Sequence, residues 1–465
     1  RLADYVFFPV SHLLRDRDRY PMRVTESVIR LLRELIQHGW KAKASPQLYH
    51  QLLVFLSFTI GGVPGQSRQQ EIPEETYVEG FRTLAALIRI TTPAHLKDGE
   101  EGQAARALGH SVTVMMDALT ELTISAIQME AVQCIYEVYS TIKEISLLAQ
   151  FFPGTVSALT KVLAPPRANQ YQKRVLLKCL EVLKLVLIRV LGDLHVRTLL
   201  KQLENERANE SKPAESKPNQ KELTPAWLKA TVGQVKIALS AVLKLRGHES
   251  EDVQSGLHKL CIALLDECHA SLVDCQSILV ETALMLEDEE TTKSPLETGL
   301  KDLACVYPEL GDSIKSALYN WITGLPRVMQ SSDERVKQLA ARSILRGSKM
   351  AAALQMDSST LEDALGDSLR DSIVTLMKGS KQPKIVDDIG DVSDGLVLAK
   401  SGMELSAYSP ILLESEAEKQ TREEIASLIS KIGSPTQQVK LAISMLGYVR
   451  DGEGVDRVAS YWLAF

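Results

Sequence analysis

Residues 171–194, YQKRVLLKCLEVLKLVLIRVLGDL, place apolar side chains three and four positions apart over the longest helix-like stretch of the chain. That spacing gathers the apolar side chains on one face of an α-helix, whereas a half-buried strand would alternate apolar and polar residues. Val175, Cys179 and Leu183 form the spine of this face. The stretch therefore predicts a helix whose apolar face must be covered by neighbouring helices.

The same spacing recurs and predicts a repeat. It is found in Val253–Leu257–Cys261 and Val336–Ala340–Ile344, and its opening is found in Val132–Tyr136 and Val439–Ile443. The valines of the five copies lie 43, 78, 83 and 103 residues apart. The first three distances are close to one or two multiples of ~40 residues, the period of HEAT and armadillo repeats. Because stacked helical pairs bury such faces against both neighbours, we predict an all-α, HEAT/armadillo-like helical-repeat solenoid in which Val336 is buried.

The composition of the 465-residue chain is typical of packed helices. Hydrophobic residues make up 45% of it and aromatic residues only 5%, and small or straight-chain side chains lose little freedom in a helix. The net charge of −6 gives no basic footprint for direct nucleic-acid binding. Six scattered cysteines favour a reducing compartment over a disulfide framework. No stretch reaches the ~18 consecutive apolar residues that predict a membrane span.

Changes in composition divide the chain into five parts. We predict N-terminal HEAT-like repeats over residues 1–203, a flexible linker over 204–223, central HEAT-like repeats over 224–378, a loop insertion over 379–420, and further HEAT-like helices over 421–465, expected to be cut at the C-terminus. The linker is rich in charged residues, Ser and Pro, and it cannot bury enough surface to order itself. Helices resume at Thr224-Pro225, which predicts an N-cap followed by Pro in the first turn.

Sequence signatures of catalysis are missing. The chain contains no GxxxxGK[ST], GxGxxG, HExxH or GxSxG motif, each of which would place reactive groups at a defined turn. We therefore expect no enzyme, no catalytic or metal-binding residues and no cofactor. The segment HKLCIALLDECHASLVDC (258–275) does gather potential zinc ligands. However, Cys261, Cys268 and Cys275 are seven residues apart among leucines, which predicts one buried face of a single helix.

Two acidic segments and four tryptophans also have ordinary structural interpretations. DDIGDVSDG (387–395) has its Asp residues three apart, which does not match the alternating ligands of a calcium loop, so we expect a solvated loop. LEDEETTKS (286–294) is expected to be a solubilising connector, with a docking or phosphorylation segment as the alternative. The tryptophans are expected to pack in the core or at helix ends: Trp40, Trp227, Trp321 and Trp462.

The chain opens with RLADYVFFPVSHLLR (1–15), without a starting Met, and this suggests that it begins inside a longer polypeptide. A helix ending in HGW (38–40) follows, and then PQLYHQLLVFLSFTIGG (46–62). This order resembles the N-terminal region of the Tti-one family of the TTT complex, most closely its fungal members. The matching residues are Asp4, Tyr5, Val6, Phe8, Pro9, Gly39, Trp40, Gly61 and Gly62.

The opening residues have two possible roles. In a solenoid, the first helix caps the apolar end of the next helical pair. We expect the apolar side chains of the opening stretch to seal this end, with a partner-binding strip as the alternative: Tyr5, Phe7, Phe8, Val10, Leu13 and Leu14. No other residue is singled out for partner binding.

The resemblance implies a function that the residues alone do not. It implies a non-catalytic scaffold that joins the Tel-two and Tti-two subunits in a co-chaperone complex. With the adaptors of the heat-shock-protein-ninety chaperone, this complex supports the maturation and stability of the PIKK-family kinases, which include mTOR, ATM and ATR. The implied processes are the DNA damage response, nutrient signalling through mTOR and telomere maintenance, in the cytoplasm and the nucleus. The alternative is a karyopherin-like nuclear transport receptor or another solenoid adaptor, for which binding to the GTPase Ran would discriminate.

Overall fold

Helices account for most of the residues that the computed structural model describes. The structure describes residues 2–15, 20–62, 72–96, 103–208, 223–287, 299–331, 333–356, 359–379, 423, 427, 435–452 and 454–464. Within these residues there are helices and turns but no β-strand, so the predicted all-α class is confirmed. The chain divides into two units, residues 1–282 and 283–465, and each is described separately below.

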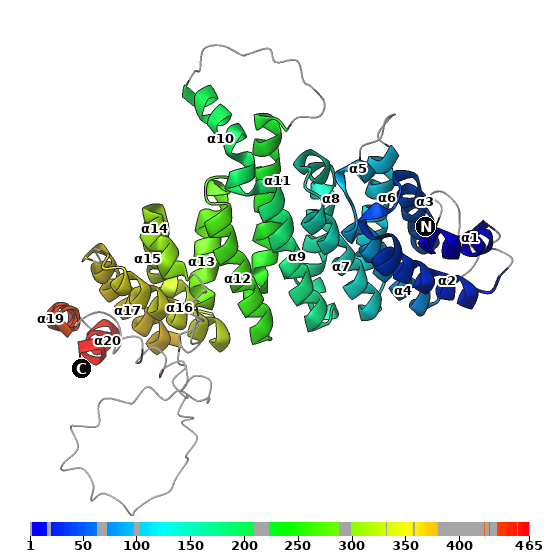
Figure 1. Cartoon of the computed structure of the whole chain (residues 1–465). Helices are drawn as coiled ribbons and strands as arrows, with labels where there is room; N and C mark the ends of the chain where they lie inside the picture. Colours follow the sequence, from blue (N-terminus) through cyan, green and yellow to red (C-terminus); the bar gives the residue numbers. More distant parts are fainter. Residues whose placement is uncertain are drawn as a thin grey trace, which may run out of the picture. The chain divides into compact units, whose positions relative to one another are not determined.

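The first unit consists of successive antiparallel helices (Figure 1). They are α1 (Leu2–Arg15), α2 (Met22–Glu34), α3 (Pro46–Gly61), α4 (Glu74–Arg89), α5 (Pro93–Leu96), α6 (Gln103–Glu121), α7 (Ser125–Thr141), α8 (Ile145–Leu163), α9 (Lys173–Leu191), α10 (Asp193–Ala208), α11 (Pro225–Val242) and α12 (Glu251–Glu267). The α2 helix continues as a π-helical segment, η2 (Leu35–Trp40), and 3-10 turns occur at Lys41–Lys43, Arg167–Gln170, Leu243–Gly247 and Val273–Cys275. The α13 helix (Gln276–Leu286) crosses the boundary between the units.

These helices form two rows. In one row α2 packs on α4, α4 on α7, α7 on α9, and α9 on α12, while in the other α3 packs on α6, α6 on α8, and α8 on α11. The helices α2, α4, α7 and α9 begin 52, 51 and 48 residues apart. The repeat is therefore longer than the predicted ~40 residues. The stacked pairs nevertheless confirm the helical-repeat solenoid.

Helix caps and buried side chains agree with the sequence in this unit. The Thr224 hydroxyl accepts a hydrogen bond from the Trp227 N–H at 3.2 Å, and Pro225 occupies the first turn of α11, which confirms the predicted N-cap. Val132, Val175 and Val253 are fully buried on α7, α9 and α12. These three helices belong to the same row, so the valine spacing does mark equivalent positions here.

Ion pairs connect successive helices of the first row. They join α2 to α4 and α4 to α7 through Arg33–Glu79 at 2.5 Å, Arg82–Glu130 at 2.8 Å and Arg89–Glu137 at 2.6 Å. The Glu79 side chain is only 8% exposed, and Arg82 also contacts it at 3.3 Å. We refer to these three pairs as the Arg–Glu ladder. They fix the register between neighbouring repeats, and the sequence analysis did not identify them.

The second unit contains α14 (Leu300–Val306), α15 (Pro308–Val328), α16 (Glu334–Ala353), α17 (Ser359–Gly379), α19 (Pro435–Asp451) and α20 (Gly454–Ala464). The α15 helix packs on α16 and α17, and α17 packs on α20, which pairs with α19. An apolar cluster joins α15, α16, α17, α19 and α20, with Leu318, Ile322, Ile344, Leu369 and Leu463 among its members.

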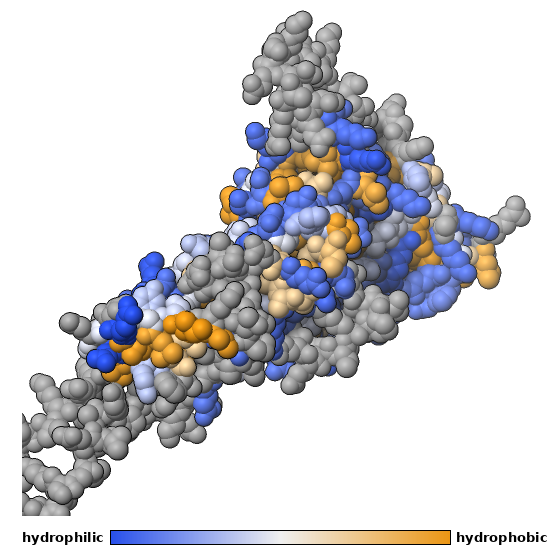
Figure 2. Space-filling model, turned by 90° about the vertical axis from the view of Figure 1, so that its left-hand side faces the viewer, coloured by the Kyte–Doolittle hydropathy of each residue, from blue (hydrophilic) through white to orange (hydrophobic). Residues whose placement is uncertain are grey.

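The valine spacing fails in the second unit. Val336 is 44% exposed, whereas Ala341 and Ile344 are buried, so the prediction that Val336 is a core position is wrong. The buried face of α16 runs through Ala341, Ile344 and Ala351, so Ile344 of the predicted face lies in the core and Val336 lies at its exposed edge. On α19, Val439 and Ile443 are likewise exposed. Figure 2 views the molecule from the side on which α19 and α20 lie, and hydrophobic residues form an elongated patch there.

The predicted domain boundaries remain predictions. The α10 helix extends to Ala208, and residues 209–222, which make up most of the predicted linker, lie outside the described residues, as do residues 380–420 of the predicted insertion. One helical segment among the described residues, Pro225–Gly247, is long and apolar enough to cross a membrane. A helix packed in the core of a protein can meet the same criterion, and 39% of the apolar window of this segment is buried.

Candidate functional site

The N-terminal helix is held by residues of the HGW stretch. Trp40 ends η2 and is buried, and its indole Nε1–H donates a hydrogen bond to Asp4 Oδ1 at 2.8 Å. This hydrogen bond holds the pKa of the Asp4 carboxyl below its ordinary value. The Phe7 ring meets the Trp40 ring edge to face at 5.2 Å between centroids. Gly39 faces Ala3 so closely that a methyl group on Gly39 would lie 2.9 Å from the Ala3 Cβ.

The outer face of α1 differs from the prediction. Ala3 and Val10 are buried against the rest of the unit, and Phe7 is half-buried. Tyr5 and Phe8 are 80% and 67% exposed, so the expectation that they seal the first repeat is wrong. The α1 helix thus packs on η2 through its inner face and presents aromatic side chains on its outer face.

A second group of matching residues borders a pocket between α3, α4 and α6. The α3 helix ends at Gly61, and Gly62 adopts a positive φ of 78°, which glycine tolerates best. A methyl group on Gly61 would collide with the Val114 side chain of α6. The absence of a side chain at Gly61 therefore allows α3 and α6 to approach closely beside a cavity of about 420 Å³.

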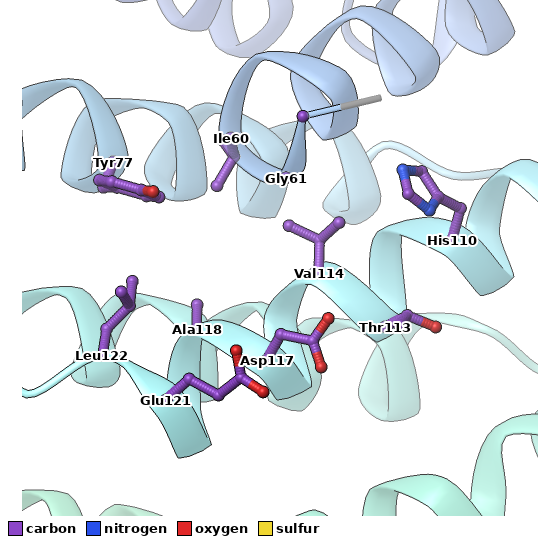
Figure 3. A pocket seen from close by; sticks show the side chains of 11 residues that line it. Ile60, Gly61, Tyr77, His110, Thr113, Val114, Asp117, Ala118, Glu121 and Leu122 are labelled. Carbon is purple, nitrogen blue, oxygen red and sulfur yellow. The ribbon is translucent and has the colours of Figure 1, made fainter. Parts of the chain in front are cut away.

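The walls of this pocket are apolar and its rim is polar (Figure 3). Ile60, Tyr77, Val114, Ala118 and Leu122 line the apolar part. The rim carries a hydroxyl, an imidazole and two carboxylates, from Thr113, His110, Asp117 and Glu121, all on α6. These four residues face the pocket because they lie three or four positions apart on one helix.

Both carboxylates are exposed to solvent, and Asp117 has an unfavourable electrostatic environment. Partial burial and the neighbouring Glu121 raise the pKa of Asp117, while Lys161 and His110 oppose the rise. Neither Asp117 nor Glu121 has a hydrogen-bond or ion-pair partner among the described residues. The Nε2 atom of His110 is buried and also lacks a hydrogen-bond partner within the described part of the chain. This arrangement can accept a cation at the rim and an apolar group inside the pocket.

The Cys/His segment folds differently from the prediction. The α12 helix ends at Glu267, and a 3-10 turn separates it from α13, so no single helix runs through residues 258–275. Cys261, Cys268 and Cys275 are nevertheless fully buried, as predicted. Burial raises their thiol pKa values to about 12, 12 and 11. No three His, Cys, Asp or Glu side chains converge as metal ligands among the residues that the structure describes.

The other sequence candidates receive mixed outcomes. Trp40 packs at a helix end as predicted, and Trp227 and Trp321 are half-buried. The side chain of Trp462, the DDIGDVSDG segment and residues 288–294 of the acidic connector lie outside the described residues. The sequence analysis missed the pocket carboxylates. The sequence shows that Asp117 and Glu121 lie one helical turn apart on an amphipathic helix. The same spacing is expected for a solvent-exposed helix face, so it did not indicate a pocket.

Comparisons with known proteins agree on one family. A family model described as "TTI1 N-terminal TPR domain" matches residues 1–290. The Saccharomyces cerevisiae protein "TEL2-interacting protein 1" is 26% identical over 320 residues, covering 63% of this chain and 31% of the yeast protein. The Homo sapiens "TELO2-interacting protein 1 homolog" is 20% identical over 359 residues, covering 72% of this chain and 32% of the human protein.

The chain spans about a third of the length of these curated relatives. A solved circular tandem repeat protein is 11% identical and covers 100% of this chain and 94% of its own, but its TM-score of 0.26 carries no argument about the fold. The family model covers well over half of the sequence and includes the HGW and Gly61-Gly62 segments that hold α1 and border the pocket. The chain therefore belongs to the family of the Tti-one N-terminal domain.

Proposed function

We propose that this chain forms the N-terminal part of a Tti-one subunit and serves as a non-catalytic scaffold of the TTT co-chaperone complex. The observation that carries the proposal is the family match over residues 1–290. The names of the yeast and human relatives describe them as interacting with Tel-two proteins. Stacked helical repeats suit this role, because they leave extended surfaces along both rows for partners.

In this proposal the complex contains Tel-two and Tti-two subunits. It works with the adaptors of the heat-shock-protein-ninety chaperone, and it supports the maturation and stability of PIKK-family kinases in the cytoplasm and the nucleus. The chain acts by binding proteins and catalyses no reaction. In this proposal the complex determines how much PIKK protein a cell contains. DNA-damage signalling, nutrient signalling and telomere maintenance depend on it for that reason.

The test is a replacement experiment in fungal cells. The full-length protein is replaced by a version that lacks residues 1–290, and the abundance of the PIKKs is measured together with their messenger RNA. We expect the kinase proteins to decline while their messenger RNA stays constant. A full-length protein carrying Val336→Asp is the matched control, since that side chain is partly exposed. Unchanged kinase levels after the deletion would refute the role of this domain.

A purified-protein experiment separates the scaffold from the transport alternative. The tagged full-length protein is mixed with recombinant Tel-two and Tti-two subunits, or with GTP-loaded Ran, and each mixture is analysed by size-exclusion chromatography with light scattering. Co-elution with the two subunits supports the scaffold. Co-elution with Ran alone would support a karyopherin-like receptor instead.

A further inference from the structure

We propose that the pocket between α3, α4 and α6 binds an arginine side chain, together with an adjacent apolar side chain, of a partner peptide. The inference is independent of the TTT assignment, because it rests only on the cavity and its lining residues. The partner is defined by chemistry: a peptide segment that presents a guanidinium group next to a hydrophobic residue.

The size of the cavity fits side chains. Its volume of about 420 Å³ lies near the lower end of the range of roughly 300–1,000 Å³ found for ligand pockets. The apolar walls, which include Ile60, Val114 and Ala118, come from α3 and α6, and Tyr77 adds an aromatic surface from α4. An aliphatic side chain and the methylene groups of an arginine can be buried against these walls.

The charge at the rim selects a cation. Asp117 and Glu121 lie one helical turn apart on α6, so that their like charges repel each other. A guanidinium group can bridge two carboxylates, because its planar shape presents several N–H donors at once. Binding of the group would neutralise this repulsion and give both carboxylates the partner that they lack among the described residues.

The Arg–Glu ladder of the same unit contrasts with these two exposed carboxylates. In the Arg–Glu ladder, Glu79, Glu130 and Glu137 are each paired with an arginine of a neighbouring helix. Asp117 and Glu121 lie beside an apolar cavity instead, in the second row of helices. An arginine of the partner peptide would form with Asp117 and Glu121 the same kind of ion pair that the arginines of the ladder form within the unit.

The test uses the whole chain and short peptides in saturation-transfer NMR, which detects weak binding to a large protein. The probe is acetyl-Leu-Arg-Leu-amide, and the matched ligand is the same peptide with citrulline, a neutral analogue of almost the same shape. We expect saturation transfer to the arginine peptide and a dissociation constant at least about tenfold higher for the citrulline peptide, which corresponds to the loss of a charge-assisted contact.

Three variants define the site. The double variant Asp117→Asn/Glu121→Gln should weaken binding of the arginine peptide about tenfold, while leaving the fold intact because neither exposed group has a hydrogen-bond or ion-pair partner among the described residues. Thr113→Trp, at an exposed position on the rim, should block the pocket for both peptides. Glu309→Gln, at an exposed position of α15, is the matched control and should leave binding unchanged.

Each outcome is decisive for the proposal. Equal binding of the arginine and citrulline peptides would overturn the charge recognition. Unchanged binding to the Asp117→Asn/Glu121→Gln variant would place the peptide elsewhere, and absence of binding at peptide concentrations of several millimolar would refute the site. None of these results depends on Tel-two, Tti-two or a kinase, so failure here leaves the TTT proposal standing.

Discussion

Replacing Gly39 with alanine should release α1 from the rest of the first unit. The new methyl group would lie 2.9 Å from the Ala3 Cβ, a distance that carbon atoms do not tolerate, and neither group can rotate away. Overpacking of this kind costs about 1–3 kcal/mol, whereas alanine gains about 0.5–1 kcal/mol over glycine inside a helix. The docking of α1 should therefore weaken by on the order of 1–2 kcal/mol.

Hydrogen–deuterium exchange of the α1 amides measures this effect directly. A loss of 1.4 kcal/mol raises the population of the open state about tenfold, so residues 2–15 should exchange about tenfold faster. The double variant Gly39→Ala/Ala3→Gly removes the opposing methyl group and should restore much of the protection. Gly233→Ala in α11, where the new methyl group meets nothing within 4 Å, is the matched control and should not affect α1.

Two results would refute this reasoning. If α1 exchanged at the same rate in the Gly39→Ala variant, the close approach of α1 and η2 would not hold the helix. If the double variant exchanged as fast as the single variant, then the effect of Gly39→Ala would not come from the Ala3 methyl group. In either case the close packing of Gly39 against Ala3 would not explain how α1 is held.

Three further predictions concern the stability and reactivity of the chain. Glu79→Gln should destabilise the first unit by about 3 kcal/mol, because it breaks a buried ion pair. The control Asp252→Asn, in an exposed ion pair, should cost less than about 1 kcal/mol. Equal urea midpoints for the two variants would show that the Arg–Glu ladder does not stabilise the unit. Lys41 has a φ of 50°, so Lys41→Gly should stabilise by about 0.5–1 kcal/mol, and a lower melting temperature would show that its backbone is unstrained. Since five cysteines are buried and only Cys305 is exposed, iodoacetamide should alkylate one thiol rapidly in the native protein, and rapid labelling of a second would contradict the predicted burial.

The helices were predictable because local sequence determines them. Apolar spacing identified α9, and Thr224-Pro225 identified the start of α11. The buried face was correct where a helix has a single apolar stripe, as at Val175. It was only partly correct on α16, where Ile344 of the predicted face is buried but Val336 is exposed, because only the neighbouring helices determine where the edge of the buried face lies.

The pocket was not predictable in the same way. It depends on the approach of α3 to α6 at Gly61, and residues more than 50 positions apart meet there. Asp117 and Glu121 could be recognised as neighbours on a helix, but the sequence gives no information about the cavity beside them. The Arg–Glu ladder was missed for a similar reason, since its partners are 46 or 48 residues apart.

The Arg–Glu ladder also has a mechanical consequence for the first unit. Its ion pairs join successive helices of one row only. Bending the unit along that row therefore changes the distances between the paired Arg and Glu side chains, whereas the helices of the other row contact each other mainly through apolar side chains. Apolar contacts resist displacement over short distances, whereas attraction between charges extends further and weakens with added salt. The bending stiffness of the first unit should therefore depend on ionic strength and differ between its two faces, which makes it an elastic element with a preferred direction of flexing.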